Sequence, residues 1–297
     1  MAGSLRLERR PTLRRPVLVA AFRGWNDGAQ GASLAAAFLA QSWQASRFAD
    51  IDPEEYFDFQ AARPHVALEE GLTRRIDWPE TVFYEAEVPG TDRDAVLLVG
   101  IEPNLRWRTF CGEITGLASD LGVELVVTLG ALLADVPHTR PAPVTGSASD
   151  PELVRELGLA ASRYEGPTGI VGVLHDACRG EGLASASLWA AVPHYASLAA
   201  SPRAALALCS RLGDLLGASF DLDDLERASE AYERQVSEAV DQDEETEAYV
   251  RELERRRDAL GEDLDVPSGD TLAAELTRFL REHEARRRAE SDEEEKP

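Results

Sequence analysis

The chain has 297 residues, of which 44% are apolar, and carries a formal net charge of −23 at pH 7. This length allows one large α/β domain with an appendage, and the apolar fraction excludes a chain that is disordered throughout. Because a chain of this charge repels phosphates, the composition argues against nucleic acids and anionic membranes as partners.

The three cysteines, Cys111, Cys178 and Cys209, are far apart in sequence and form no C-x-x-C pair. Their odd number and spacing are typical of reduced thiols in a cytosol. The apolar run "VLVAAF" ends at Arg23 and is too short for a signal peptide. The longest uncharged stretch, 182–202, contains a proline and a histidine, which a membrane helix would avoid. We therefore expect a cytoplasmic protein.

Strand-like and helix-like segments alternate through the first half of the chain. Residues 1–15 are rich in arginine, and we expect them to form a flexible N-terminal arm. Apolar or alternating aromatic runs predict strands, in chain order, at 16–22, 55–60, 81–88, 95–101 and 123–130. Apolar residues at helical spacing predict helices at 29–43 and at 105–121, the second capped by Asn104.

The second half continues this alternation after a proline-rich loop over 135–149. Asp150 and Pro151 have the residue types that open a helix, as cap and as first helical residue. The run "TGIVGVL" predicts a strand at 168–174, and helices are expected at 183–199 and 202–217. Continuous apolar strands separated by helices favour a mostly parallel sheet covered on both faces. We expect a three-layer α/β/α core domain over 16–220.

The composition changes after residue 220. Residues 221–297 hold 27 acidic and 12 basic side chains, so most of the net negative charge lies there. Apolar residues at helical spacing predict an acidic helical extension over 221–289, including a last helix near 271–288, before a disordered tail at 290–297. Because such narrow apolar stripes cannot fold alone, the extension must pack on its own body or on another chain. We expect a helical lid on the same molecule.

The first candidate site is the sequence "RGWNDG", which separates a predicted strand from a helix. It supplies Arg23, Gly24, Asn26 and Asp27. Backbone N–H groups at such a helix start can hold a phosphate or a carboxylate. The glycine spacing matches neither G-x-G-x-x-G nor a P-loop. The alternative is a tight turn in which Asn26 or Asp27 caps the helix and Trp25 packs.

The second candidate site is "DVPHTRPAPVTG", which follows a predicted strand and supplies Asp135, His138, Thr139 and Arg140. Ligands bind at the ends of parallel strands in open α/β sheets, and an imidazole near these charges is suited to phosphate binding or acid–base chemistry. The alternative is structural. The prolines indicate a rigid loop, whose buried polar groups must satisfy one another.

Signatures of common catalytic sites are missing from the sequence. No histidines, cysteines or carboxylates stand at metal-ligand spacing, and G-x-S-x-G is absent. We expect no metal, no cofactor and no catalytic residue.

Five blocks occur here in order: "FRGWNDGAQGAS", "EPNLRW", "GALLADVPHTRPAPVTG", "YEGPTGIVGVLH" and "SLWAAVPHYASLAASPRAALAL". Together they make the chain resemble the proteasome assembly chaperone 2 family, in its bacterial branch from high-GC organisms. The resemblance implies a fold similar to that of phosphorylases and peptidyl hydrolases, a homo-oligomer, and proteasome α-type subunits as partners. It assigns no catalytic residues. Beyond the two candidate sites, the matched motif residues include Glu102, Arg106, Trp107, Trp189, His194 and Tyr195.

One departure affects the expected mode of binding. Some relatives insert a C-terminal hydrophobic-Tyr-X tail between proteasome subunits, whereas this chain ends in Glu-Lys-Pro. The leading hypothesis is a non-catalytic, oligomeric binding protein of the assembly-chaperone kind. The alternative is an enzyme or sensor that binds an anionic or nucleoside-like ligand where 23–28 and 135–146 converge. A third hypothesis is a scaffold that uses the acidic extension as its contact.

Overall fold

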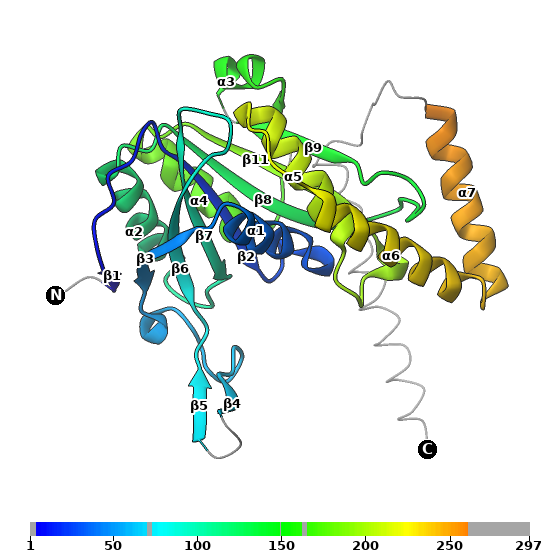
Figure 1. Ribbon diagram of the computed structural model, residues 1–297, viewed down its shortest axis with the longest axis horizontal. Helices are drawn as coiled ribbons and strands as arrows, with labels where there is room; N and C mark the ends of the chain where they lie inside the picture. The colour runs from blue at the N-terminus through cyan, green and yellow to red at the C-terminus, as the bar shows by residue number, and fades with distance from the viewer. Residues whose placement is uncertain (1–3, 70–72, 149, 162–164, 261–297) are drawn as a thin grey trace.

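The computed structural model describes residues 4–69, 73–148, 150–161 and 165–260 (Figure 1). Within these residues one nine-stranded sheet forms the centre, in the order β1-β3-β6-β7-β2-β8-β11-β9-β10. Its strands are β1 (Leu5–Leu7), β2 (Val17–Arg23), β3 (Ser46–Ile51), β6 (Thr81–Glu87), β7 (Asp94–Ile101), β8 (Leu125–Ala134), β9 (Val144–Ala148), β10 (Ala160–Ala161) and β11 (Ser185–Pro193). A second sheet holds only β4 (His65–Glu69) and β5 (Thr73–Asp77).

Four parallel strands form the middle of the large sheet. β2 pairs in parallel with β7 and β8, and β8 pairs in parallel with β11. On one flank β6 and β3 add in antiparallel order, and on the other β9 pairs antiparallel with β11. The prediction of parallel strands thus holds for the buried centre, where apolar runs are continuous, while antiparallel strands extend both edges.

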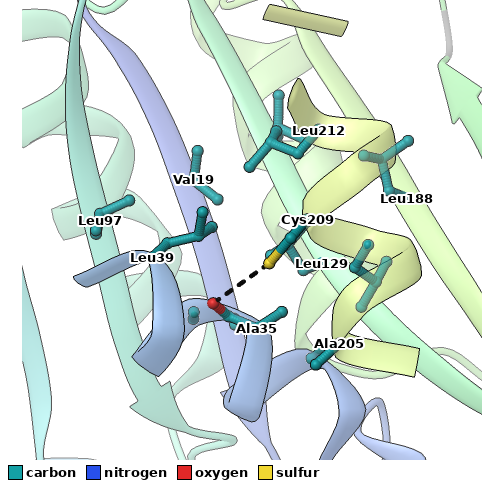
Figure 2. Packing of buried hydrophobic residues seen from close by; sticks show 14 of the residues in the cluster. Val19, Ala35, Leu39, Leu97, Leu129, Leu188, Ala205, Cys209 and Leu212 are labelled. Atoms are coloured by element: carbon teal, nitrogen blue, oxygen red, sulfur yellow. Dashed lines mark hydrogen bonds between the residues drawn. The ribbon is translucent and has the colours of Figure 1, made fainter. Parts of the chain in front are cut away.

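Helices cover both faces of this sheet, which confirms the predicted three-layer α/β/α architecture. α1 (Gly31–Ser42) and α5 (Pro202–Leu216) pack on one face, and α2 (Trp107–Asp120) and α4 (Ile170–Glu181) pack on the other. Figure 2 shows the first layer, in which Leu39 and Leu212 meet Val19 and Leu129 of the sheet. α3 (Pro151–Glu156) opens with the predicted cap, because the Asp150 carboxylate accepts from two backbone N–H groups of its first turn.

Three predicted elements were assigned to the wrong structure. Residues predicted as a strand at 168–174 begin helix α4, and the predicted helix at 183–199 contains strand β11. The segment 55–60 contains no strand and follows a short 3-10 helix, η2 (Pro53–Glu55). Asn104 does not cap α2, because its side-chain oxygen accepts from the backbone N–H of Asp58 instead.

The N-terminal arm, expected to be flexible, contributes to the sheet over part of its length. β1 pairs antiparallel with β3, with Arg6 opposite Asp50 in register. Three of the arginines that follow, Arg9, Arg14 and Arg15, are paired with carboxylates. The Arg14 guanidinium lies 2.6 Å from the Asp94 carboxylate, which is 8% exposed. Edge pairing and these ion pairs give the arm a defined place that its composition did not predict.

The described part of the helical extension packs on its own body. α6 (Asp223–Val240) lies against α5 and buries Leu225 and Tyr232. α7 (Glu244–Leu260) follows after a turn, runs at an angle to α6 and buries Val250 and Leu253 (Figure 1). The last helix expected near 271–288 and the tail at 290–297 lie outside the described residues. Nowhere in the described chain is there a helix with the length and apolar character of a membrane span.

Candidate functional site

The C-terminal ends of the parallel strands β2, β7, β8 and β11 form one row, which we call the C-terminal edge of the sheet. The predicted candidate residues follow these strand ends: the 23–27 loop leaves β2, Glu102 follows β7, the 135–140 loop leaves β8, and the 3-10 helix η3 (His194–Ala196) follows β11. This edge is where open α/β sheets bind ligands. The fold therefore brings both candidate sites to one edge, although each loop has its own partners.

The 24–27 loop is organised around the carboxylate of Glu102. One carboxylate oxygen accepts from the Asn26 side-chain amide at 3.1 Å and from the backbone N–H of Ile170, in the first turn of α4, at 2.8 Å. The other accepts from the backbone N–H of Trp25 at 3.3 Å. Glu102 thus occupies the anion-binding position at the N-terminus of α4 and ties it to the loop.

Gly24 is required at the turn because its φ is +136° and a Cβ there would lie 2.9 Å from the Cβ of Glu102. A side chain at this position would meet both backbone strain and a steric clash. The next residue, Trp25, is 39% exposed, so it does not pack as the turn interpretation expected. The glycine therefore serves the close approach of the loop to Glu102.

Asp27 is the cap of α1, as one of the two interpretations predicted. Its side chain is 8% exposed, and one carboxylate oxygen accepts from the backbone N–H groups of Ala32 at 2.8 Å and Ser33 at 3.1 Å. Burial raises the pKa of this carboxyl, although the hydrogen bonds from Ser33 and Ala32 oppose the shift. The donors at the start of α1 are thus already bound by the protein itself.

His138 lies at the centre of the second cluster and is 1% exposed. Its backbone N–H donates to the phenolic oxygen of Tyr195 at 2.8 Å, and its Nδ1 lies 3.0 Å from the same oxygen. Its Nε2 lies 2.9 Å from the hydroxyl of Ser237, on α6. One imidazole therefore joins the β8 loop, η3 and the helical extension.

A neutral imidazole satisfies all of these contacts. We assign the tautomer in which the Tyr195 hydroxyl donates to Nδ1, because the phenolic oxygen already accepts from the His138 backbone N–H. In this assignment Nδ1 is the unprotonated nitrogen, and Nε2–H donates to Ser237. Burial lowers the pKa of His138, so the neutral ring is the form that this site holds.

The next two residues of the loop hold α7. The Thr139 hydroxyl donates to the carboxylate of Glu254. The Arg140 guanidinium donates to both carboxylate oxygens of Asp258, each at 2.9 Å, in a bidentate pair. Arg203 of α5 also contacts the loop, because its guanidinium donates to the Arg140 carbonyl at 2.8 Å. Thr139 and Arg140 thus bind the extension in this closed arrangement.

Aromatic rings and Asp135 complete this second cluster. The Asp135 carboxylate lies 3.3 Å from Nδ1 of His194. Burial, followed by the hydrogen bond with Asp135, raises the pKa of Tyr249. The ring of Tyr249 meets His194 at 5.6 Å and Tyr195 at 6.2 Å, both edge to face. The extension therefore contributes an aromatic side chain to the cluster as well as charges.

Comparison with known proteins identifies the family. The family model described as PAC2 family matches residues 21–240. This chain belongs to the PAC2 family. A PAC2 family protein from Streptomyces avermitilis is 50% identical, with 79% of this chain and 99% of that chain covered and a TM-score of 0.74. A search of curated proteins found no match.

Two further solved structures are similar to this PAC2-family chain. A proteasome-assembly chaperone homologue from Mycobacterium tuberculosis is 48% identical over 79% of this chain and 99% of its own, with a TM-score of 0.72. An archaeal proteasome activator from Pyrococcus furiosus is 17% identical over 79% of this chain and 97% of its own, with a TM-score of 0.64. At that identity the archaeal structure shares the fold alone.

The other residues singled out from the sequence blocks have contacts of their own. The Arg106 guanidinium pairs with the carboxylate of Glu55, and the Trp107 indole N–H donates to the carbonyl of Pro103. The Trp189 ring lies directly over Gly130, where an added Cβ would come within 2.3 Å of it. Arg23 is exposed at the end of β2. These contacts show how the motif holds the loops in place.

Sequence reasoning missed the site residues that the extension supplies: Ser237, Tyr249, Glu254 and Asp258. Glu254 and Asp258 stand four residues apart, so they share one helical face, but the same spacing recurs throughout this acidic segment. Nothing near Ser237 in sequence signals a histidine partner 99 residues away. Among the described residues, no three His, Cys, Asp or Glu side chains group as a metal site would need.

Proposed function

We propose that this PAC2-family protein is a non-catalytic, oligomeric binding protein whose partners are proteasome-type subunits or another protein. The Mycobacterium relative is described as a proteasome-assembly chaperone homologue, and it is similar to nearly four-fifths of this chain. That likeness supports the chaperone class of function. The main support for the proposal is the exposed apolar face of the β4–β5 hairpin.

The β4–β5 hairpin extends away from the body and carries an exposed apolar face (Figure 1). Val66 lies opposite Ile76 in register, and Leu68 follows Val66 on the same face. These side chains are 61%, 51% and 65% exposed, respectively. At the base, Trp78 is 46% exposed and meets the Phe59 ring at 4.9 Å. Exposed apolar surface of this kind supports association with another chain, which would also stabilise an otherwise marginal hairpin.

The sheet edge gives less support to the alternative of an anion-binding enzyme or sensor. The N–H groups at the starts of α1 and α4 are the donors that a phosphate would use. Asp27 and Glu102 already accept from them, so a bound phosphate would have to displace a carboxylate of the protein and would meet its charge. Rigid loops held this way are suited to presenting a surface.

A cytoplasmic location is part of the same proposal. Cys111, Cys178 and Cys209 are all buried and free. Burial raises the pKa of the Cys111 thiol to about 12 and that of Cys178 to about 11, which keeps these groups protonated and unreactive. Free, unpaired thiols in the core support a reducing compartment.

The test combines the mass of the full-length protein in solution with capture of purified proteasome α and β subunits at physiological salt. Leu68→Lys places a charge on the apolar hairpin face and should weaken association at least tenfold. His65→Lys changes an exposed residue on the opposite face and should leave association unchanged. A monomer that captures neither subunit, or equal effects of the two variants, would contradict the proposal.

A further inference from the structure

We propose that the helical extension, α6 and α7, is a latch over the 135–140 loop and that acid opens this latch by protonating His138. The inference does not depend on the proposed function. It rests on how the imidazole is held between the loop, η3 and α6.

Both ring nitrogens of His138 are committed in the closed state. Nδ1 accepts from the Tyr195 hydroxyl, and Nε2–H donates to Ser237 of α6. A proton added to Nδ1 would face the Tyr195 oxygen, which already accepts from the His138 backbone N–H. The phenolic hydrogen would then lose its acceptor, and a cation would sit where the side chain is 1% exposed. The closed latch therefore excludes the protonated ring.

Charged groups from every neighbouring element surround this imidazole. Burial is the largest effect on its pKa and lowers it, and the positive charge of Arg203 acts in the same direction. Glu233 of α6, Asp241 directly after α6 and Glu254 of α7 oppose the shift. Two of these carboxylates are already engaged, because Glu233 pairs with Arg203 and Glu254 accepts from Thr139.

The remaining charged neighbours are held in pairs of their own. Asp135 faces His194 beside Tyr195, and Arg140 pairs with Asp258 of α7. Carboxylates titrate below the range in which histidines titrate, so between pH 7.5 and 5.5 the Arg140–Asp258 pair keeps its charges. His194 is a second histidine between loop and latch, because its ring also meets Tyr249 of α7 at 5.6 Å. It is present in both wild type and His138→Gln, so a comparison of these two proteins isolates the effect of His138.

The sign of the pH effect follows from this geometry. When α6 moves away, His138 contacts water and its pKa returns toward the ordinary 6.5. The open state then binds a proton that the closed state rejects, so each pH unit below 6.5 raises the opening equilibrium up to tenfold. At pH 5.5 we expect the latch to open more than at pH 7.5, by up to about tenfold. Opening would present the 135–140 loop and η3 to a partner.

Hydrogen–deuterium exchange of the full-length protein tests this directly, by comparing wild type with His138→Gln at pH 7.5 and pH 5.5. Peptides from α6 and α7 have the same sequence in both proteins, so the intrinsic pH dependence of exchange cancels in their ratio. Wild-type protection of these peptides should fall by about twofold to tenfold at pH 5.5 relative to the variant. Peptides from β2 and β8 report global unfolding and should not follow this change.

Further variants keep the test decisive. His65→Gln removes an exposed histidine on the hairpin and should retain the wild-type response. If His138→Gln loses protection in β2 and β8, an NMR titration of His138 in wild type and Ser237→Ala replaces it. Loss of the Ser237 contact should raise the titration midpoint toward 6.5. A latch response below twofold, an equal response in His138→Gln, or an unchanged midpoint in Ser237→Ala would overturn the proposal.

Discussion

Replacing Glu102 by alanine should destabilise the protein more than its partly exposed position suggests. The carboxylate accepts from the backbone N–H groups of Trp25 and Ile170 and from the side-chain amide of Asn26. These groups belong to the β2 loop and to the first turn of α4. Alanine would leave all of them without this acceptor and would remove a negative charge from a helix N-terminus.

The magnitude follows from the surroundings of each donor. Ile170 is 0% exposed and Asn26 is 2% exposed, so water cannot easily replace the lost bonds, and each should cost about 1–1.5 kcal/mol. The Trp25 N–H belongs to an exposed residue and should cost little. Glu102→Ala should therefore lower the free energy of unfolding by roughly 2–3 kcal/mol. Glu102→Gln keeps one acceptor but loses the charge, and should cost about 1 kcal/mol.

Urea unfolding followed by circular dichroism measures these differences, provided that the m-value stays constant. Glu80→Ala is the matched control, because the Glu80 side chain is 61% exposed and its carboxylate lies 3.8 Å from Arg47. It should change the stability by less than about 0.5 kcal/mol. If Glu102→Ala costs no more than this control, Glu102 does not organise the loop as we argue.

Gly130→Ala would drive a Cβ to within 2.3 Å of the Trp189 ring and should cost about 1–3 kcal/mol in urea unfolding; an unchanged midpoint would show that the ring moves freely. Gly24→Ala places a side chain at a φ of +136° and should cost a similar 1–3 kcal/mol of backbone strain. Gly28 has no positive φ, so its substitution lacks this cost of backbone strain. His175 lies in α4, where its Nε2 is 3.0 Å from the Thr128 hydroxyl, and burial lowers its pKa to about 4. Its contribution to the free energy of unfolding is therefore complete above pH 6.5 and is lost as the pH falls toward 4. Relative to His175→Gln, wild type should lose roughly 1–3 kcal/mol over that range, and parallel pH profiles would refute the assignment.

The sequence predicted three of the four parallel central strands, β2, β7 and β8, because each of them is a continuous apolar run. β2, β7 and β8 lie where such runs were read, and Asp150 caps its helix as its residue type indicates. Asp27 as the cap of α1 was also among the predicted alternatives. These features depend on residues close together in sequence, so local physical rules describe them.

α4 was predicted as a strand and β11 as a helix, because a short apolar run does not distinguish a buried strand from a buried helix. In α4 the β-branched residues suggested a strand, yet Ile170, Leu174 and Cys178 are buried four residues apart, which is helical spacing. In β11 the alanines suggested a helix, but both faces of this strand are buried between helices. Tertiary burial overrode local propensity in both cases.

By itself the sequence determined the layers of the fold, its family motifs and the edge of the sheet at which the conspicuous polar residues gather. Only the tertiary structure decided what those residues do. Glu102 and Asp27 bind the donors of two helices, and His138 joins a loop to Ser237, 99 residues further along. Hydrogen bonds over such separations depend on how the helices pack over the sheet, and no local sequence pattern specifies that packing.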